Sequence, residues 1–440
     1  MIDPATFVRW FRGALPYIHT HRSRTFVIHF EGEAVADGER FASLVHDIAL
    51  LHGLGIHLVL VPGIRPQIEA RLRQRGLACR YHRGRRITDA AALECVKEAA
   101  GQVRVEIEAR LSLGVADSPM AGMRLPVVSG NFITAKPLGV IDGIDFEYTG
   151  EVRRVDTAGI QALLAQARLV LITPLGYSPT GEVFNLRAEA VATAVATALK
   201  ADKFLILMEQ GCEVDGKPVA QLTSEEARDH LRHGRFPAPV TPHVEAAVAA
   251  VEGGVERAHL LDRHLDGALL LELFTRDGAG TLISRQPFES LRPARTDDIP
   301  GILELIAPLE REGILVRRSR EKLERDLADY CVIERDGLVI GCAALHAFPE
   351  VKMGELACLA LHPDYRGENR GQRLLAHVEA QARRRGLERL FVLTTRTLHW
   401  FRERGFRPAT FTDLPVQRQR CYNAQRNSKV LIKCLRPSGG

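Results

Sequence analysis

The sequence has no long hydrophobic run, no C-x-x-C pair and no low-complexity tract. Its longest apolar segments resemble Ile56–Val61 and fall far short of the ~18 residues that a membrane-spanning helix needs, so we expect no membrane association. The first residues include Asp3, Pro4, Arg9 and Arg12, which do not fit the apolar core of a secretory signal. We therefore expect a cytoplasmic protein whose eight cysteines are reduced thiols.

Lysine is also scarce, because only 9 of the 59 basic residues are lysine and the other 50 are arginine. Residues 291–440 hold 27 basic and 19 acidic side chains, a net charge of +8, which leaves −3 for residues 1–290. A basic C-terminal third suits an anionic ligand, although an arginine-rich composition explains it equally well. Aromatic residues are few, at 6%, and are not interleaved with the basic ones, so we expect no nucleic-acid partner.

The length of 440 residues, with 46% hydrophobic and 26% charged residues, is typical of a globular protein of two to four domains. His230 and His233 have no third ligand at a suitable spacing, so we expect no metal site.

Residues 21–285 alternate between strand-like and helix-like patterns, which favours an α/β domain with a mainly parallel sheet between helices. The predicted strands are Thr25–Phe30, Ile56–Val61, Val127–Ala135, Phe146–Val155, Leu169–Thr173 and Lys203–Met208. The predicted helices are Phe41–His52, Ile64–Gln74, Ile87–Leu113, Gly159–Gln166 and Ala188–Leu199.

An aromatic helix is predicted within residues 1–20, ahead of the first strand. Its apolar residues recur at helical spacing and are Phe7, Trp10, Phe11, Ala14, Leu15 and Ile18. Such a helix has little of its own domain to pack on. It either docks on another subunit or caps the core.

The pattern changes at Ser284–Ser290, a polar stretch without periodicity, where we place a domain boundary. The second domain, residues 290–440, begins with a strand, and a helix starts at Thr296. The strands Tyr330–Glu334 and Leu338–Ala347 flank Arg335-Asp336-Gly337, which predicts a hairpin.

The most informative segment is Gly354–Leu375, in which an apolar strand is followed by His-Pro and by an Arg/Gly loop that opens a helix. Unpaired N–H groups and the helix dipole bind a diphosphate at such a place. The loop resembles the acyl-CoA motif R/Q-x-x-G-x-G/A of the GNAT acetyltransferases. Arg366 and Gly371 match its ends, and Asn369 replaces the first glycine, which the tolerance of Asn for left-handed backbone permits. The resemblance implies a GNAT α+β fold and a diphosphate cradle of Arg366, Gly367, Glu368, Asn369, Arg370 and Gly371.

Acetyl transfer to an amine needs a neutral nucleophile, a polarised thioester carbonyl and a protonated leaving thiolate. Glu355, on the strand beside this loop, is the candidate base. Backbone groups of Cys358, Leu359 and Leu361 are candidates to hold the carbonyl and the pantetheine, with Cys358 packing rather than acting as a nucleophile. The tyrosine usual in GNAT enzymes is Phe401 here. The thiolate donor therefore stays open between Thr394 and Thr395, with His399 a weaker candidate.

Two basic groups are candidates to bind a carboxylate, because arginine binds carboxylates bidentately. The first is Arg317 with Arg318, and the second is Arg426 with Lys429. The alternative for each group is a solvated basic surface.

Residues 1–285 resemble the amino-acid kinase fold, most closely that of acetylglutamate kinase. The matching segments are Val27–Gly32, Leu58–Pro66, Val128–Asn131, Asn185–Glu189 and Leu199–Lys203. His29 stands where active kinases have Lys, Glu31 stands where they have Gly, and only Gly63 remains of a run of glycines. Phosphoryl transfer depends on those groups, so we expect a kinase relic that does not use ATP.

The segment Ala258–Ile283 resembles the arginine-binding segment of arginine-sensitive relatives. The resemblance implies an effector site that pairs Glu272 with a guanidinium and lets the backbone at Gly278 and Gly280 approach it. By the same resemblance the site includes Tyr17, Lys203 and His259. It also implies that the N-terminal helix builds rings of dimers, and hence a homo-oligomer, expected to be a hexamer.

A kinase-like domain followed by a GNAT domain is the arrangement of the bacterial-type N-acetylglutamate synthases, and the resemblance covers the whole chain. It implies that acetyl-CoA and L-glutamate give N-acetyl-L-glutamate by direct attack, without a metal, as the first step of arginine biosynthesis. It also implies feedback inhibition by L-arginine. Arg318 and Arg426 would then bind the glutamate carboxylates. The alternatives are an acetylglutamate kinase-type enzyme with an appended GNAT module, or a GNAT enzyme that acetylates another amine.

Overall fold

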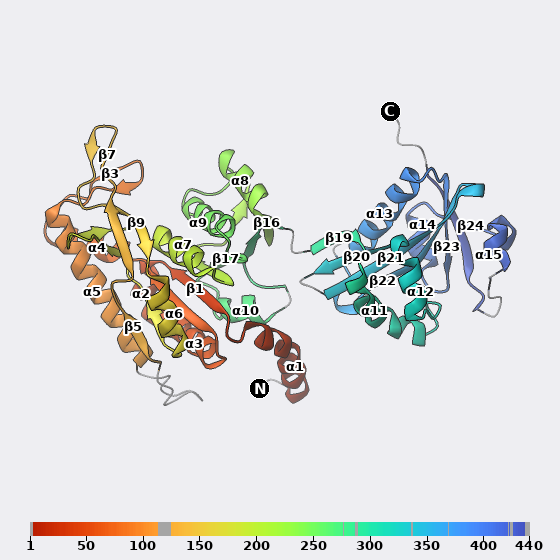
Figure 1. Ribbon diagram of the computed structural model, residues 1–440, viewed down its shortest axis with the longest axis horizontal. Helices are drawn as coiled ribbons and strands as arrows, with labels where there is room; N and C mark the ends of the chain where they lie inside the picture. The colour runs from red at the N-terminus through yellow and green to blue at the C-terminus, as the bar shows by residue number, and fades with distance from the viewer. Residues whose placement is uncertain are drawn as a thin grey trace. The chain divides into compact units, whose positions relative to one another are not determined.

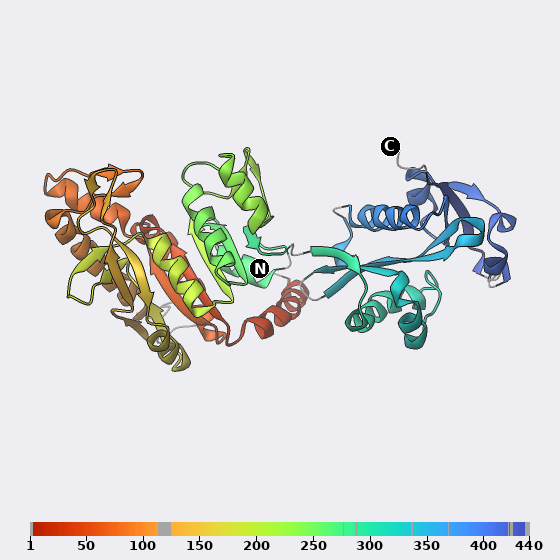
Figure 2. The ribbon, with the colours of Figure 1, turned by 45° about the horizontal axis from the view of Figure 1, so that its top comes forward.

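Strand β1 (Thr25–Phe30) is buried on both faces and lies in an eight-stranded sheet. This sheet belongs to the first of two compact units, residues 1–287 and 288–440, into which the chain divides (Figures 1 and 2). The computed structural model describes residues 3–112, 125–275, 277–286, 289–335, 338–367, 369–420, 422 and 426–435. None of the helices among these residues has the length and apolar character that crossing a bilayer requires.

The main sheet of the first unit is parallel throughout its described pairs except between β17 and β18. Its order is β16 (Gln221–Thr223), β18 (Thr281–Ser284), β17 (Arg257–Asp262), β13 (Lys203–Met208), β1, β2 (His57–Pro62), β10 (Leu169–Leu171) and β5 (Val127–Ser129). The mainly parallel sheet predicted from the alternating pattern is therefore confirmed.

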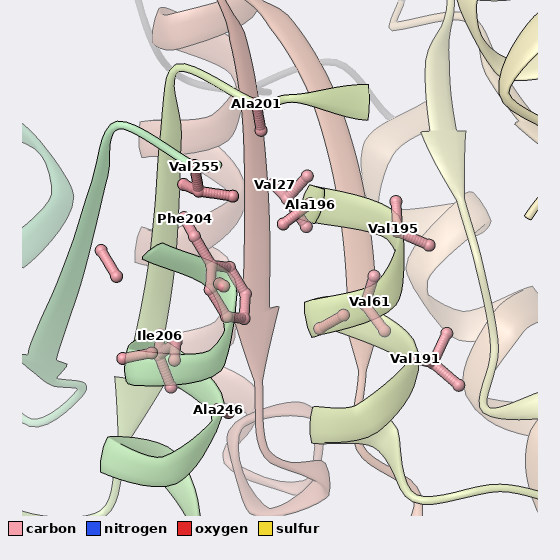
Figure 3. Packing of buried hydrophobic residues seen from close by; sticks show 14 of the residues in the cluster. Val27, Val61, Val191, Val195, Ala196, Ala201, Phe204, Ile206, Ala246 and Val255 are labelled. Atoms are coloured by element: carbon pink, nitrogen blue, oxygen red, sulfur yellow. The ribbon is translucent and has the colours of Figure 1, made fainter. Parts of the chain in front are cut away.

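Helices cover both faces of this sheet and so create three layers. Phe26 and Ile28 of β1 join a core with α3 and α5, whereas Val27 faces α7 and α9. Figure 3 shows the second core, to which Val27, Val61, Val195 and Phe204 all belong. The helices of this unit are α1 (Pro4–His21), α2 (Gly32–Ala36), α3 (Gly38–Gly53), α4 (Arg65–Gln74), α5 (Ala90–Ser112), α6 (Thr157–Ala165), α7 (Ala188–Leu199), α8 (Ser224–Arg232), α9 (Thr241–Glu252) and α10 (Ala268–Phe274).

The expected strand Val127–Ala135 is two strands in two different sheets. Residues 127–129 form β5 of the main sheet, whereas β6 (Ile133–Pro137) belongs to a second sheet of order β12-β11-β6-β9. The expected strand Phe146–Val155 shortens to β9 (Gly150–Val155). The other two strands of the second sheet are β11 (Leu175–Tyr177) and β12 (Val183–Asn185). The described part of this unit also contains three two-stranded pairs: β3 (Tyr81–His82) with β4 (Arg85–Arg86), β7 (Val140–Ile141) with β8 (Ile144–Asp145), and β14 (Glu213–Val214) with β15 (Lys217–Pro218).

The second unit contains one seven-stranded sheet that is antiparallel except between β22 and β23 among its described pairs. Its order is β19 (Glu289–Pro293), β20 (Tyr330–Arg335), β21 (Leu338–Phe348), β22 (Met353–Leu361), β23 (Arg389–Thr394), β25 (Lys429–Cys434) and β24 (Arg407–Ala409). β20 and β21 form the predicted hairpin; Asp336 and Gly337 of its turn lie outside the described residues.

Among the described residues of this unit, four α-helices pack on the sheet and a fifth is polar. α11 (Ile299–Arg311) and α12 (Arg320–Asp326) bury residues in one core, while α13 (Arg370–Arg384) and α14 (Leu398–Glu403) bury residues in another. The polar helix is α15 (Val416–Arg420).

Candidate functional site

Strands β22 and β23 pair over only three residues and then separate. The parallel pairing joins Met353–Glu355 to Arg389–Phe391, and the rest of both strands borders a cavity of about 1170 Å³. Cys358 causes a register shift against β21 and has a φ of +51°, which marks a bulge in β22. Leu359 and Leu361 line the cavity beyond this bulge. The bulge and the separation leave backbone of β22 beside an open space in which an extended ligand can pair.

The predicted diphosphate loop closes one end of this cavity. Arg366, Gly367, Asn369, Arg370 and Gly371 all line it, whereas Glu368 lies outside the described residues. Gly367 and Asn369 have φ angles of +119° and +55°, so Asn369 does occupy the left-handed region. α13 begins directly afterwards, and the N–H groups of its first turn have no acceptor within the helix.

Gly371 leaves little room for a side chain, and its backbone does not adopt a positive φ. A Cβ atom there would lie 3.2 Å from Cζ2 of Trp400 and 3.5 Å from Cδ1 of Leu361. Trp400 was not identified as a site residue from the sequence. It lies within the segment that resembles the family, and that segment was the signal that could have identified it.

The candidate base Glu355 is buried and its carboxylate is held by Arg418. Nε of Arg418 donates to Oε2 at 2.7 Å, and Nη2 donates to Oε1 at 3.1 Å. Both residues line the cavity. Arg418 was missed in the sequence because it is one arginine among many in this region. Its role depends on a partner 63 residues away.

Three guanidinium groups converge on the same part of the cavity. Arg318, Arg418 and Arg426 all line it, and burial together with the charges of Arg318 and Arg418 lowers the pKa of Arg426. Arg426 also donates to the carbonyl of Ile314. Buried Ser428 lines the cavity beside them and was missed from the sequence, although it lies in the matched segment Asn427–Val430. This end of the cavity can bind more than one negative charge.

The structure separates the members of the two predicted basic groups. Arg318 faces the cavity while its neighbour Arg317 is exposed and is not among the residues that line it. Arg426 lines the cavity, whereas Lys429 is exposed.

The candidate thiolate donors are also separated. Thr394 is buried and lines the cavity, whereas Thr395 and His399 are exposed and do not line it. Oγ1 of Thr394 accepts from the N–H of Thr397 at 3.0 Å and lies 2.8 Å from the Thr397 hydroxyl. Phe401 is 2% exposed and packs against Phe406 in the core.

Cys358 belongs to a buried group of thiols. A hydrogen bond with the Cys342 thiol and the charge of Arg318 lower the pKa of Cys358, against the opposing effect of burial. The Cys342 thiol also donates to the carbonyl of Cys358 at 3.4 Å.

Three of the predicted effector residues, Lys203, His259 and Glu272, form one hydrogen-bonded cluster in the first unit. Nζ of Lys203 lies 3.3 Å from Nε2 of His259, whose Nδ1 lies 2.5 Å from Oε1 of Glu272. Burial and the charge of Lys203 lower the pKa of His259 to about 4. A neutral His259 fits this arrangement, accepting from Lys203 and donating to Glu272.

The loop after α10 completes this cluster. Oε2 of Glu272 accepts from the N–H groups of Ala279 and Gly280 at 2.6 and 2.9 Å. Burial acts to raise the pKa of Glu272, but the hydrogen bond from His259 and these N–H groups lower it to about 2. A Cβ atom at Gly278 would lie 2.6 Å from Glu272, so the loop can only approach because Gly278 has no side chain. Tyr17 of α1 is half-buried against the core that contains α10.

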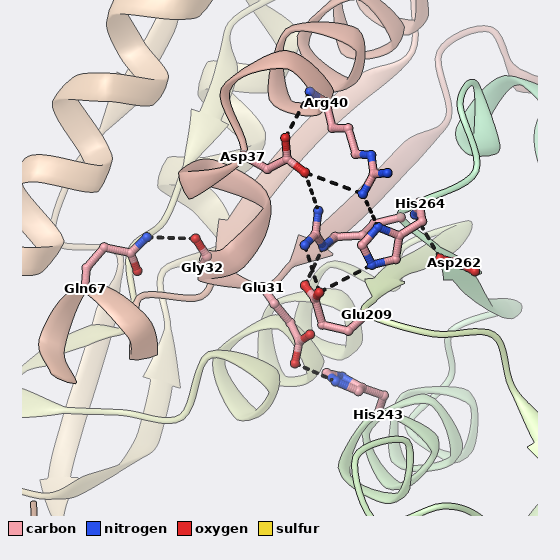
Figure 4. A network of polar contacts seen from close by, with 10 residues as sticks. Glu31, Gly32, Asp37, Arg40, Gln67, Glu209, His243, Asp262 and His264 are labelled. Carbon is pink, nitrogen blue, oxygen red and sulfur yellow. Dashed lines mark hydrogen bonds and ion pairs between the residues drawn. The ribbon is translucent and has the colours of Figure 1, made fainter. Parts of the chain in front are cut away.

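His29 and Glu31, which replace the lysine and glycine of active kinases, both have partners within the first unit. Nδ1 of His29 lies 2.8 Å from the carbonyl of Val61, and Glu31 pairs with His243 at 3.0 Å. Glu209 accepts from the guanidinium of Arg263 and pairs with His264, and Figure 4 shows these contacts close to the Glu31–His243 pair. Carboxylate oxygens of Glu31, Glu33 and Glu209 lie within 4.8 Å of one another. The guanidinium of Arg263 compensates the charge of Glu209.

Comparison with family models finds two matches that follow one another along the chain. Residues 24–262 match the amino acid kinase family, and residues 299–406 match the acetyltransferase (GNAT) family.

Comparison with individual proteins finds relatives along nearly the whole chain. The amino-acid acetyltransferases of Ectopseudomonas mendocina and Azotobacter vinelandii are each 53% identical to it, covering 98% of this chain and 99% of theirs. The crystal structure of N-acetylglutamate synthase from Neisseria gonorrhoeae complexed with coenzyme A and L-arginine is 41% identical, with a TM-score of 0.87. The structure of that enzyme complexed with coenzyme A and N-acetyl-glutamate is 42% identical, with a TM-score of 0.63. Each covers 98% of this chain and 99% of the other.

Proposed function

The chain belongs to the amino-acid acetyltransferase family and is an N-acetyltransferase, and we propose that it acetylates the α-amino group of L-glutamate with acetyl-CoA. The products are N-acetyl-L-glutamate and CoA, and L-arginine is the feedback inhibitor. The observation that supports this most directly is the cavity of the second unit, which joins a diphosphate loop to a cluster of three arginines.

Acetyl-CoA fits the long part of this cavity. Its diphosphate would lie at the N-terminus of α13, where backbone N–H groups and the helix dipole favour an anion. Its pantetheine would pair with backbone of β22 between Cys358 and Leu361, where β23 has moved away. The thioester would then lie between β22 and β23, near Glu355 and Thr394.

Glutamate fits the arginine end because it carries two carboxylates. Arg318 and Arg426 each donate one hydrogen bond to a backbone carbonyl, of Val316 and Ile314, and their remaining N–H groups can bind the two carboxylates of the substrate, with Ser428 as a further hydrogen-bonding group. Arg418 pairs with Glu355 in this structure, so a substrate carboxylate bound there would compete for its guanidinium. That exchange would release the oxygens of Glu355 beside the substrate amine.

The reaction proposed is a direct transfer without an acyl-enzyme. Glu355, directly or through a water molecule, takes a proton from the substrate ammonium, and the neutral nitrogen attacks the thioester carbonyl. The C–N bond forms, the C–S bond breaks and the thiolate takes up the remaining proton. Thr394 can hydrogen-bond that thiolate, since Thr397 already supplies its oxygen with a donor.

The first unit would act as the regulatory part. L-arginine would bind where Lys203, His259 and Glu272 meet the loop at Gly278, with Tyr17 at the border of the site. Helix α1 exposes a run of apolar side chains, Val8, Trp10, Phe11 and Leu15, at 42%, 56%, 52% and 58%. We propose that this surface packs on another copy of the chain to form a homo-oligomer, expected to be a hexamer, in the cytoplasm.

A free-thiol assay with a panel of amino acids, with and without arginine, tests the proposal. We expect CoA release from acetyl-CoA that depends on L-glutamate and is suppressed by L-arginine. Release without an amino acid, or with a lysine peptide in preference to glutamate, would contradict the proposed substrate. Acetylglutamate-dependent formation of ADP would favour the kinase alternative instead.

A further inference from the structure

The guanidinium of Arg370, the first residue of α13, binds both the carboxylate of Glu289 on β19 and the carbonyl of Tyr365, which precedes the diphosphate loop. Its Nε and Nη2 both lie 2.8 Å from Oε2 of Glu289, and its Nη1 donates to the carbonyl of Tyr365 at 3.3 Å. Arg370 is 4% exposed and the side chain of Glu289 is 11% exposed. This ion pair is therefore shielded from solvent and competes little with water.

These contacts add to the hydrogen bond from the N–H of Arg370 to the carbonyl of Gly367 within the loop. The residues between Tyr365 and Arg370 include two left-handed conformations, at Gly367 and Asn369. The other oxygen of Glu289 accepts from Nη1 of Arg373 at 2.5 Å, one turn further along α13. One carboxylate thus binds the start of the helix twice and, through Arg370, reaches the residue that precedes the loop.

We propose that Glu289 is a positioning residue for the diphosphate of coenzyme A. By holding Arg370 and Arg373, it keeps the loop and the first turn of α13 in the conformation that directs their N–H groups into the cavity. The proposal rests on the proposed function in that the ligand is a CoA thioester. Glu289 is also the first residue of β19, the strand that opens the second unit.

The expected effect is confined to one end of the coenzyme. Without the carboxylate, two guanidinium groups stay close together and the buried one loses its counter-charge, so the start of α13 shifts. The pantetheine site on β22 and β23 does not include Glu289 or its partners. A change at Glu289 should therefore weaken binding of the diphosphate and leave binding of pantetheine as it was.

The test compares CoA with a carrier that lacks the diphosphate. In the full-length Glu289→Gln variant we expect the Kd for CoA, measured by calorimetry, to rise about 10- to 100-fold, the size of effect seen when a group that orients a direct ligand is lost. The KM for acetyl-CoA should rise in parallel, whereas kcat/KM for acetyl-pantetheine should change less than about two-fold. Glu289→Asp should restore part of the CoA affinity. An unchanged Kd for CoA, or an equal loss with acetyl-pantetheine, would overturn the proposal.

A matched control separates positioning from general stability. Arg292 and Asp298 form another bidentate ion pair of the second unit, at 2.7 and 2.8 Å, and Asp298 is 7% exposed. Asp298→Asn should lower the unfolding temperature without changing the Kd for CoA. Equally weakened CoA binding in the Asp298→Asn and Glu289→Gln variants would refute a specific role for Glu289.

If Glu289→Gln does not fold, Arg373→Met is the second variant, because it removes only the more exposed partner of Glu289. It should raise the Kd for CoA by a smaller factor, and an unchanged Kd would count against the proposal. If the wild-type protein binds CoA but shows no turnover that depends on glutamate, that result would instead contradict the proposed function.

Discussion

The carboxylate of Glu355 and the guanidinium of Arg418 form a bidentate ion pair within the cavity, with N–O distances of 2.7 and 3.1 Å. Both oxygens of the carboxylate accept from this guanidinium, so a rearrangement that releases Arg418 would open them further to a substrate ammonium. The anionic substrate itself supplies a reason for that rearrangement, because its carboxylates compete for the same arginine cluster. In the proposed mechanism, binding of the substrate and activation of Glu355 as the base would then be linked through Arg418.

Glu355→Gln should reduce kcat by about 10²- to 10⁴-fold, because removal of a general base has effects of that size. The KM for acetyl-CoA should change little, since the diphosphate and pantetheine contacts remain. Glu350, five residues earlier in the chain, is an exposed carboxylate, and Glu350→Gln is therefore the matched control that should keep full activity. A Glu355→Gln enzyme with normal kcat would show that another group accepts the proton.

Arg318→Met should raise the KM for glutamate about 10- to 100-fold, because a charge-assisted hydrogen bond contributes about 1.5–3 kcal/mol. Arg317→Met changes the neighbouring arginine, which is exposed and does not line the cavity. Steady-state kinetics with glutamate as the varied substrate should show the increase only for Arg318→Met. Equal effects of the two substitutions would argue that the charge of the segment matters and not the contact.

Glu272→Gln should weaken arginine binding at least about 10-fold, because the cluster would lose the carboxylate that can pair with a guanidinium. Calorimetry with L-arginine measures this directly, and inhibition of the acetyltransferase gives a second reading. Glu256→Gln alters a carboxylate that is 66% exposed and should leave the response to arginine as in the wild type. Unaltered arginine binding by the Glu272→Gln variant would place the effector elsewhere.

Asp47 should make the first unit less stable as the pH rises. Burial, followed by the charge of Asp266, raises the pKa of Asp47 from its ordinary value of 3.8 to about 7. Between these two values the folded protein binds more protons than the unfolded chain, so the free energy of unfolding falls with increasing pH, by about 4 kcal/mol at most. Asp47→Asn should therefore raise the unfolding temperature at pH 8, and the difference should vanish near pH 4. Calorimetric scans at both pH values test this, with the exposed Asp229→Asn as the control; a variant less stable than the wild type at pH 8 would contradict it.

Replacing Trp10 and Phe11 together by Ser should lower the mass of the protein in solution if α1 mediates self-association. Both side chains are more than half exposed, so the substitutions remove apolar surface without emptying the core. Light scattering coupled to size exclusion measures the mass. Val105→Ser, at a residue that is 55% exposed on α5, should leave it unchanged. The proposed interface would be wrong if the double variant kept the wild-type mass.

The sequence predicted features that depend on neighbouring residues. Strand β1 has the predicted bounds, because a short run of buried apolar residues specifies a central parallel strand. The left-handed backbone at Asn369 was also predicted, since that preference is a property of the residue itself. In contrast, the periodicity of residues 127–135 could not show that the chain leaves one sheet for another near Gly130.

The sequence by itself determined the α/β order of the first unit, the hairpin of the second and the loop that opens α13, because local pattern and backbone preference specify them. Only the tertiary structure decided that Arg318 rather than Arg317, and Thr394 rather than Thr395, faces the cavity. It alone brought Arg418 to Glu355 and Arg370 to Glu289, across 63 and 81 residues of sequence. The direction of a side chain and the identity of its partner are set by how distant segments pack, and no local pattern of residues carries that information.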